Sequence, residues 1–257
     1  MQFMKWIKRT AWVVSFMLLG PAYMGVFGNI TLGADWQTAD RSSAGIAPDP
    51  KTTNEAVIQV YAARAFSWRG IFAVHTWIAT KGKNAASYTV HEVLGWRANQ
   101  GLPVVSTTPG IADRSWYGAT PEILVDIRGA KAQALIPKIA EAAIAYPYPD
   151  SYVIWPGPNS NTFTAWVARH VPELSVDLPT TAVGKDFLGG ARVFDRTPSG
   201  TGVQLSVFGV LGIAAGTREG VELNVLGFNM GIDPLGLAIK LPGVGRVGMP
   251  SHTAGAE

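Results

Sequence analysis

The feature that most restricts the fold is an apolar stretch near the N-terminus, Ala11 to Gly28, which follows Lys5, Lys8 and Arg9. As an α-helix this stretch would be about 27 Å long, close to the hydrocarbon thickness of a bilayer. Basic residues before it and none directly after it favour an N-terminus that stays in the cytoplasm. We therefore expect residues 1–33 to form a membrane anchor that crosses the bilayer once.

Two alternatives to a retained anchor stay open at this N-terminus. A cleaved signal peptide has similar basic and apolar regions, and Gly20-Pro21-Ala22 could end its helix. No clean small-x-small cleavage site follows, because Ala22-Tyr23-Met24 has a large residue in its third position. A helix buried in the protein is the other alternative. Residues 34–54 have the composition of a solvated linker, and residues 249–257 that of a loose tail.

The composition excludes several classes of protein. With 257 residues, 47% of them hydrophobic, and nine Trp, the chain can bury a substantial core, so it is not largely disordered. The absence of Cys excludes disulfides, thiolate metal sites and a cysteine nucleophile. A net charge of +3 without a long basic run argues against a nucleic-acid partner.

The middle of the chain, residues 55–183, predicts an α+β core. Residues 56–64, 70–80, 87–97, 102–107 and 121–128 are rich in β-branched and aromatic residues and are separated by Gly, Pro and Asn, which is typical of strands. A short strand is also expected at 152–155. Residues 130–145 and 161–170 have apolar side chains at helical spacing. The fold class that follows is a mainly antiparallel sheet with two packed helices.

Residues 184–248 have a different composition, with about half of the chain's 29 glycines. Val203–Gly209 is echoed eighteen residues later by Val221–Gly227, and both copies alternate apolar and polar residues, which predicts strands with one covered face. We expect a Gly-rich β-hairpin extension here. The alternative is a second membrane span over Val203–Ala215.

Few residues remain as candidates for chemistry. Gly243–Gly248 fits Gly-x-Gly-x-x-Gly, but too few residues follow it to form the helix that a dinucleotide site needs. His75 and His91 lie in neighbouring predicted strands, and Ser160 lies at a helix start, an arrangement that would suit a base, an orienting partner and a nucleophile. The structural alternatives are a hydrogen-bonded core histidine and a helix N-cap serine. His91-Glu92 has too few other candidate ligands nearby for a metal site.

The segment Asn159-Ser160-Asn161-Thr162-Phe163 resembles the nucleophile segment of circularly permuted papain-like proteins, the group that contains lecithin retinol acyltransferase. That group has cysteine where this chain has Ser160, and the order His, His, nucleophile matches the permuted arrangement. Residues 55–248 resemble a bacterial membrane-associated family of unknown function, through the His75-Thr76-Trp77 strand, the Trp155–Phe163 segment and the Gly-rich C-terminus.

These resemblances imply an anchored envelope protein in the bacterial inner membrane, with its main domain facing the periplasm. We expect a hydrolase or acyltransferase that acts on an amide or ester of an envelope molecule without a metal or cofactor. His75 would be the base, His91 would orient it and Ser160 would attack. The residues expected to bind substrate are Trp77, Trp155, Asn159, Asn161 and Thr162. The alternative is a non-catalytic module that binds lipid or peptidoglycan fragments.

Overall fold

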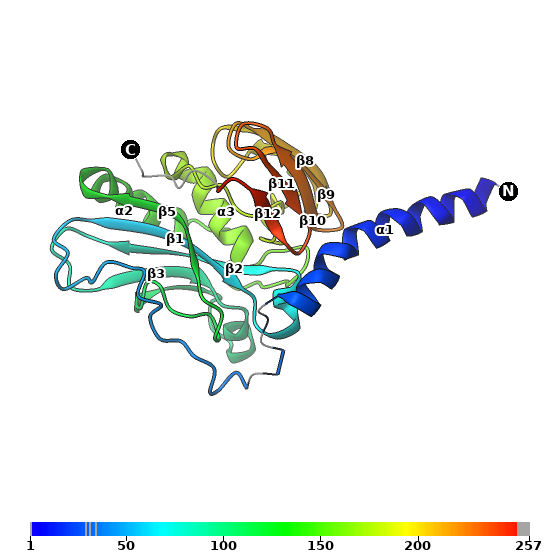
Figure 1. The fold of residues 1–257 in the computed structure, drawn as a ribbon. Helices are drawn as coiled ribbons and strands as arrows, with labels where there is room; N and C mark the ends of the chain where they lie inside the picture. The colour runs from blue at the N-terminus through cyan, green and yellow to red at the C-terminus, as the bar shows by residue number, and fades with distance from the viewer. Residues whose placement is uncertain (1, 29, 31, 34, 251–257) are drawn as a thin grey trace.

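The computed structural model describes residues 2–28, 30, 32–33 and 35–250, and shows an α+β protein with two antiparallel sheets (Figure 1). The first sheet has five strands in the order β4-β3-β2-β1-β5. Its strands are β1 (Val57–Arg64), β2 (Val74–Lys81), β3 (Tyr88–Val93), β4 (Val105–Gly110) and β5 (Glu122–Arg128). The five strands expected between residues 56 and 128 are therefore confirmed, with ends that differ by a few residues.

The five-stranded sheet is buried on both faces. Two helices, α2 (Gly129–Ile144) and α3 (Ser160–His170), pack on one face over alternate residues of β1 such as Ile58 and Val60. The other face carries Tyr61 and Trp77, whose rings stack at 5.3 Å. Because both faces are covered, almost every residue of β1 and β2 is buried, including polar residues such as Gln59 and Thr76.

Three short 3-10 helices complete this region: η1 (Ser67–Ile71), η2 (Gly95–Gln100) and η3 (Pro172–Leu174). The strand expected at residues 152–155 is wrong. The N–H of Val153 donates to the carbonyl of Pro158, so this segment closes a local loop and does not pair with a sheet.

The second sheet is a seven-stranded meander in the order β12-β11-β10-β9-β8-β7-β6. Its strands are β6 (Phe194–Arg196), β7 (Gly202–Val207), β8 (Leu211–Gly216), β9 (Gly220–Val225), β10 (Phe228–Asp233), β11 (Ala238–Leu241) and β12 (Gly245–Gly248). The expected extension is thus larger than a hairpin, because β8 lies between the two sequence copies and more strands follow. The second membrane span over Val203–Ala215 is wrong, since these residues form β7 and β8.

The turn between β9 and β10 shows how the meander reverses direction so tightly. Leu226 and Gly227 both have positive φ, 54° and 78°, and they alone separate the two strands. A two-residue turn of this kind matches the twist of the flanking strands.

The N-terminal helix α1 (Gln2–Phe27) extends away from the two sheets (Figure 1). Its second half rests on the turn between β11 and β12, where Gly20 lies too close to Pro242 for any Cβ to fit. The side chain of Arg64 joins the same place by donating to the carbonyls of Gly243 and Val244 at 2.6 and 3.1 Å. Within the described part of the chain, no helix combines the length and the apolarity that crossing a membrane requires. Most of the expected C-terminal tail, residues 251–257, lies outside the described residues.

Candidate active site

The start of α3 is fixed by a reciprocal capping arrangement. Asn159 Oδ1 accepts hydrogen bonds from the N–H groups of Asn161 and Thr162, and Thr162 Oγ1 accepts one from the N–H of Asn159. This capping box makes Ser160 the first residue of the helix. The expected helix start is therefore confirmed, but the N-cap is Asn159, and the hydroxyl of Ser160 is not used for capping.

The same three polar residues fasten the helix start to its surroundings. The Asn161 side chain donates to the carbonyls of Val74 and Val183 at 3.0 and 2.8 Å, and Thr162 donates to that of Gly184 at 2.8 Å. The Asn159 amide donates to Ile154 and Val183. We expected these three residues, Asn159, Asn161 and Thr162, to bind substrate. Their polar groups instead form internal hydrogen bonds that hold Ser160 in place.

His75, near the start of β2, has a carboxylate partner. Its Nε2 lies 3.2 Å from Oε2 of Glu92, and the same oxygen accepts a hydrogen bond from Arg114 at 2.5 Å. The His75 ring stacks on Trp116 with a centroid distance of 3.5 Å and an angle of 8° between the planes. The ring is therefore oriented by a charged hydrogen-bond chain at one edge and by an indole across its face.

These contacts determine which nitrogen of His75 can act as a base. Burial lowers the pKa of His75, against the opposing effect of the Glu92 hydrogen bond, so the ring is neutral near pH 7. Burial alone would raise the pKa of Glu92, but its hydrogen bond with His75 and the charge of Arg114 hold it below its usual value. An ionised Glu92 can only accept, so the His75 proton is assigned to Nε2 and Nδ1 is left with a free lone pair.

His91 does not lie beside His75, and the orienting contact expected from the sequence is wrong. Its Nε2 lies 3.0 Å from Thr80 Oγ1, and its Nδ1 lies 3.2 Å from Thr107 Oγ1. In the register of β2 with β3, His91 pairs with Ile78 and therefore shares the sheet face of even-numbered β2 residues. His75 has odd parity and faces the other side, together with Glu92. Burial lowers the pKa of His91 to about 4.

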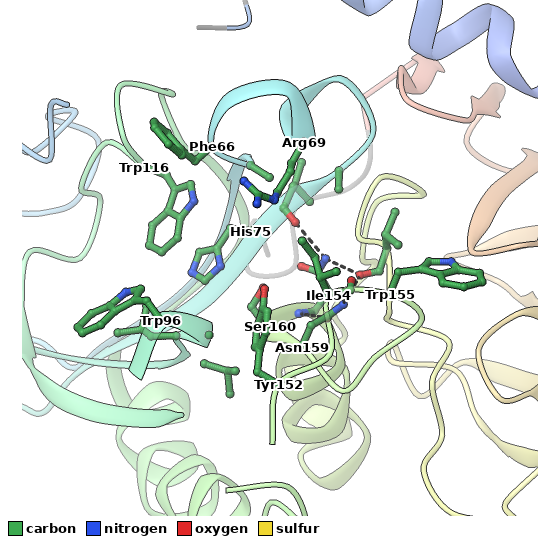
Figure 2. A pocket seen from close by; sticks show the side chains of 18 of the residues that line it. Phe66, Arg69, His75, Trp96, Trp116, Tyr152, Ile154, Trp155, Asn159 and Ser160 are labelled. Atoms are coloured by element: carbon green, nitrogen blue, oxygen red, sulfur yellow. Dashed lines mark hydrogen bonds between the residues drawn. The ribbon is translucent and has the colours of Figure 1, made fainter. Parts of the chain in front are cut away.

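Both His75 and Ser160 line a cavity of about 1280 Å³. In Figure 2, Trp116 and Trp96 lie on the His75 side of this cavity, and Trp155 lies on the opposite side. Neither Nδ1 of His75 nor Oγ of Ser160 has a hydrogen-bond partner among the described residues, and neither belongs to the buried polar atoms that lack one. Both atoms are therefore open to the cavity.

The lining of the cavity is mainly aromatic and carries positive charge. Trp155, expected from the sequence, lines it and donates from Nε1 to the carbonyl of Leu226 at 2.9 Å. Trp77 does not line it, because this ring is fully buried in the sheet and donates to the carbonyl of Ala112. Two arginines, Arg41 and Arg69, reach the cavity, and among the described residues no carboxylate lines it.

The segment expected to be a solvated linker takes part in the site. Asp113 accepts hydrogen bonds from the hydroxyl of Ser43 and from the N–H groups of Ile46 and Ala47. These bonds hold residues 43–47 against the loop that carries Arg114 and Trp116. The preceding residues then bring Trp36 and Arg41 to the cavity.

Sequence reasoning missed Glu92 as the partner of His75, although one signal was present. A carboxylate inside the expected strand Tyr88–Val93 is costly to bury unless it is paired, so it predicts a buried cation or imidazole beside it. Metal binding gains no support, because no group of three potential ligands exists among the described residues. Neighbouring strand positions also place His91 and Glu92 on opposite faces of β3.

Residues 55–187 match the model of a protein family described as a protein of unknown function, DUF3750. The chain belongs to this family. The DUF3750 match includes the five-stranded sheet, α2, α3 and all four residues His75, Glu92, Arg114 and Ser160, and it ends before the seven-stranded sheet begins. No curated protein and no solved structure matches the chain. The comparisons therefore support the expected family of unknown function and show no likeness to papain-like proteins.

Proposed function

We propose that this member of the DUF3750 family is a hydrolase or acyltransferase that acts on an amide or ester of an envelope molecule. Ser160 is the nucleophile, His75 the general base and Glu92 the residue that orients the base. The observation that carries the proposal is that Ser160 Oγ and His75 Nδ1, both without a partner among the described residues, open to one cavity. Glu92 replaces His91 in the third role, because only Glu92 contacts His75.

The chemistry follows from the protonation states. Ser160 Oγ attacks the substrate carbonyl while its proton passes to Nδ1 of His75, which forms an imidazolium stabilised by Glu92. The tetrahedral intermediate then collapses, the bond to the leaving amine or alcohol breaks, and His75 returns the proton to that group. Water or a second alcohol or amine, deprotonated by His75, then attacks the acyl-Ser160 ester. The bond between the acyl carbon and Ser160 Oγ breaks, His75 returns the proton to Oγ, and the acyl product leaves.

The N-terminus of α3 supports the developing negative charge. The N–H of Ser160 has no hydrogen-bond partner among the described residues, while the next two N–H groups are taken by Asn159. A free N–H at a helix N-terminus is a suitable donor for an oxyanion, and the helix dipole adds to its effect. The Asn159 and Asn161 side chains, with their amides already donating, do not serve as oxyanion donors.

The cavity suggests an amphiphilic substrate with a negative charge. Its aromatic walls favour an apolar chain or ring system. Arg41 and Arg69 supply positive charge without a carboxylate beside them in the lining, which favours an anionic group. An acylated envelope molecule with a phosphate or carboxylate meets both conditions.

Attachment to the inner membrane through α1 belongs to the same proposal. Exposed aromatic and aliphatic residues such as Trp12, Leu19 and Val26 follow the basic residues at the start of the helix. This pattern suits contact with lipid, and the basic residues favour the cytoplasmic side for the N-terminus and the periplasm for the body. The single pass expected from the sequence stays a prediction.

A non-catalytic binding module is the second candidate. It is favoured by the lack of a hydrogen bond between Ser160 and His75, and by the close stacking of His75 on Trp116. In a catalytic site the Ser160–His75 hydrogen bond would form when substrate binds, because such bonds are often long in empty sites.

Reaction of the full chain with a fluorophosphonate probe tests the proposal. We expect labelling that is lost in Ser160→Ala, falls by roughly 100-fold or more in His75→Ala, and falls less in Glu92→Gln. His91→Ala is the matched control, because it removes a buried histidine of the same sheet that does not reach the cavity, and it should keep its labelling. Labelling that survives Ser160→Ala, or equal loss in both histidine variants, would contradict the catalytic assignment and favour the binding module.

A further inference from the structure

The seven-stranded sheet exposes its apolar face and buries its polar face, which is the reverse of an ordinary sheet. Its outward face is apolar, and three ladders of apolar side chains run across it. In each ladder the residues are paired across neighbouring strands: Val203, Ala215, Val221, Ile232, Ile239 and Val247; Phe194, Leu205, Ile213, Leu223 and Met230; Val207, Leu211 and Val225. The first row ends at the exposed Arg196 of β6, which pairs with Val203, and the other partners that the register gives these rows are uncharged.

The inward face of this sheet is polar. Asp186, fully buried, accepts hydrogen bonds from Gln204, Asn224 and Asn229 of three different strands. Lys185 pairs with Glu222 at 2.6 Å in the same layer. The polar residues of the period-eighteen repeat therefore point into the protein, so the covered face predicted for these strands is the polar one.

The apolar outward face is too large for a small ligand. With strands about 4.8 Å apart, it extends for roughly 30 Å across the seven strands. Its large side chains remain close to half exposed, for example Leu205 at 51% and Ile213 at 47%. A contiguous patch of this kind on a folded protein marks an interaction surface.

The position of α1 favours lipid as the partner of this face. The helix packs directly on the β11–β12 turn of this sheet, through Gly20 against Pro242 and Pro21 against Gly243. It projects from the side of the molecule on which β8, β9 and β10 lie (Figure 1). The helix and the seven-stranded sheet thus meet at the β11–β12 turn, and both lie on this side of the protein.

The cavity adjoins this side as well. The turn that joins β9 to β10 contributes Leu226, Gly227 and the start of β10 to the cavity wall. On the other side of the same cavity, η1 lies against α1, with Ile71 beside Gly25. A substrate that leaves the bilayer between α1 and the sheet would therefore reach the site directly.

We propose that the outward face of the seven-stranded sheet lies on the surface of a lipid bilayer, beside α1, and holds the cavity mouth at the membrane. This inference rests on the proposed attachment through α1 and adds a second, independent contact. It gives the reversed polarity a physical reason, because acyl chains cover the apolar side chains while the protein interior satisfies the polar ones.

Single-cysteine labelling tests the inference, because the chain has no native Cys to interfere. The full chain would be reconstituted in phosphatidylethanolamine–phosphatidylglycerol vesicles, with an environment-sensitive fluorophore on Ile213→Cys or Leu223→Cys. Ile144→Cys, on an exposed isoleucine of α2, is the matched control, and Phe16→Cys reports on α1. We expect blue-shifted emission and several-fold stronger quenching by doxyl lipids at positions 213 and 223 than at 144.

The four labels separate the two membrane contacts. Quenching at position 16 with aqueous emission at 213 and 223 would overturn the sheet contact and leave the α1 attachment standing. Quenching at 213 and 223 alone would support the sheet contact and contradict the α1 attachment. Labels at 213 and 223 that are shielded from iodide but not quenched by doxyl lipids would overturn the proposal in favour of a second copy of the chain. No association with the vesicles would overturn both contacts.

Discussion

The two sheets bury opposite kinds of side chain. In the five-stranded sheet Ile78 is fully buried, and apolar clusters cover both faces. In the seven-stranded sheet Ile213 is 47% exposed, while Glu222 and Lys240 are buried. The first sheet therefore gains its stability from the hydrophobic effect, whereas the second is held by backbone pairing and by a buried layer of charges and amides.

The two sheets differ in their relation to the candidate site. The DUF3750 match coincides with the conventionally packed region, which positions His75 and Ser160. The reversed sheet follows it and is joined to α3 through Arg169, which donates to Gln204 of β7 at 2.7 Å. The core of the five-stranded sheet therefore positions the candidate catalytic residues, while the second sheet contributes Leu226 and Gly227 to the cavity wall.

The largest expected loss of stability comes from removing a cation from the buried layer of charges in the second sheet. Lys240 contacts Glu222 at 2.7 Å and Asp177 at 3.2 Å, and burial raises the pKa of Asp177 to about 6 despite this cation. Lys240→Met leaves both carboxylates without this cation, so we expect a loss of about 3–5 kcal/mol in the free energy of unfolding. Urea unfolding of the full chain in a mild detergent measures it.

The control for this variant is Lys138→Met. Lys138 forms an exposed ion pair with Glu173, and its removal should cost less than about 1 kcal/mol. Equal losses in the two lysine variants would show that the buried layer contributes no more than a surface pair, and would remove the contrast between the sheets.

The next effect compares the same substitution in both sheets. Ile78→Ala opens a cavity in the core of the first sheet, and we expect it to cost about 3–4 kcal/mol. Ile213→Ala removes an exposed side chain and should cost less than about 1 kcal/mol. Urea unfolding midpoints of both variants give the comparison. A loss at Ile213 as large as that at Ile78 would mean that the outward face is packed against protein.

The sequence predicted the first sheet better than the second, for a physical reason. Strands that are buried on both faces are recognisable from their β-branched and aromatic content alone, and Pro and Gly mark their ends. In the second sheet the alternation Val203–Leu205–Val207 was recognised, but alternation does not say which face is covered. The sequence therefore predicted one covered face, and the structure shows that the polar face is the covered one.

The sequence predicted part of the candidate site, and the part that it got wrong depends on strand register. His75 and Ser160 share the cavity, and a strand and a helix start are strong local signals. The third member depends on whether His91 or Glu92 shares a face with His75, and a one-residue change of register reverses that choice. Register comes from pairing between strands, and local sequence does not specify it.

A pH-dependent effect of His91 ranks third. Its folded pKa of about 4 lies below the value of about 6.5 for an unfolded histidine. Between pH 4 and 6.5 the unfolded chain therefore binds more protons at this residue than the folded chain, so stability falls as the pH falls. From pH 7 to pH 4 this histidine should remove about 2–3 kcal/mol.

His91→Gln keeps hydrogen-bonding groups near Thr80 and Thr107 but removes the titration. The difference between wild type and variant, measured by urea unfolding at several pH values, isolates His91 from other groups that titrate in this range, including Asp177 with the opposite sign. Parallel pH profiles for the two proteins would show that His91 is not held neutral by burial.

The smallest effect expected concerns polar substitution on the outward face. Leu223→Thr keeps a good strand former at a 43% exposed position, so it should change the free energy of unfolding by less than about 1 kcal/mol. The buried counterpart Leu174→Thr should cost several times more, because it places a hydroxyl in the core. Urea unfolding of both leucine variants measures the contrast. If Leu223→Thr were as destabilising as Leu174→Thr, the face would belong to a protein interior, and the reversed polarity of the sheet would no longer require lipid.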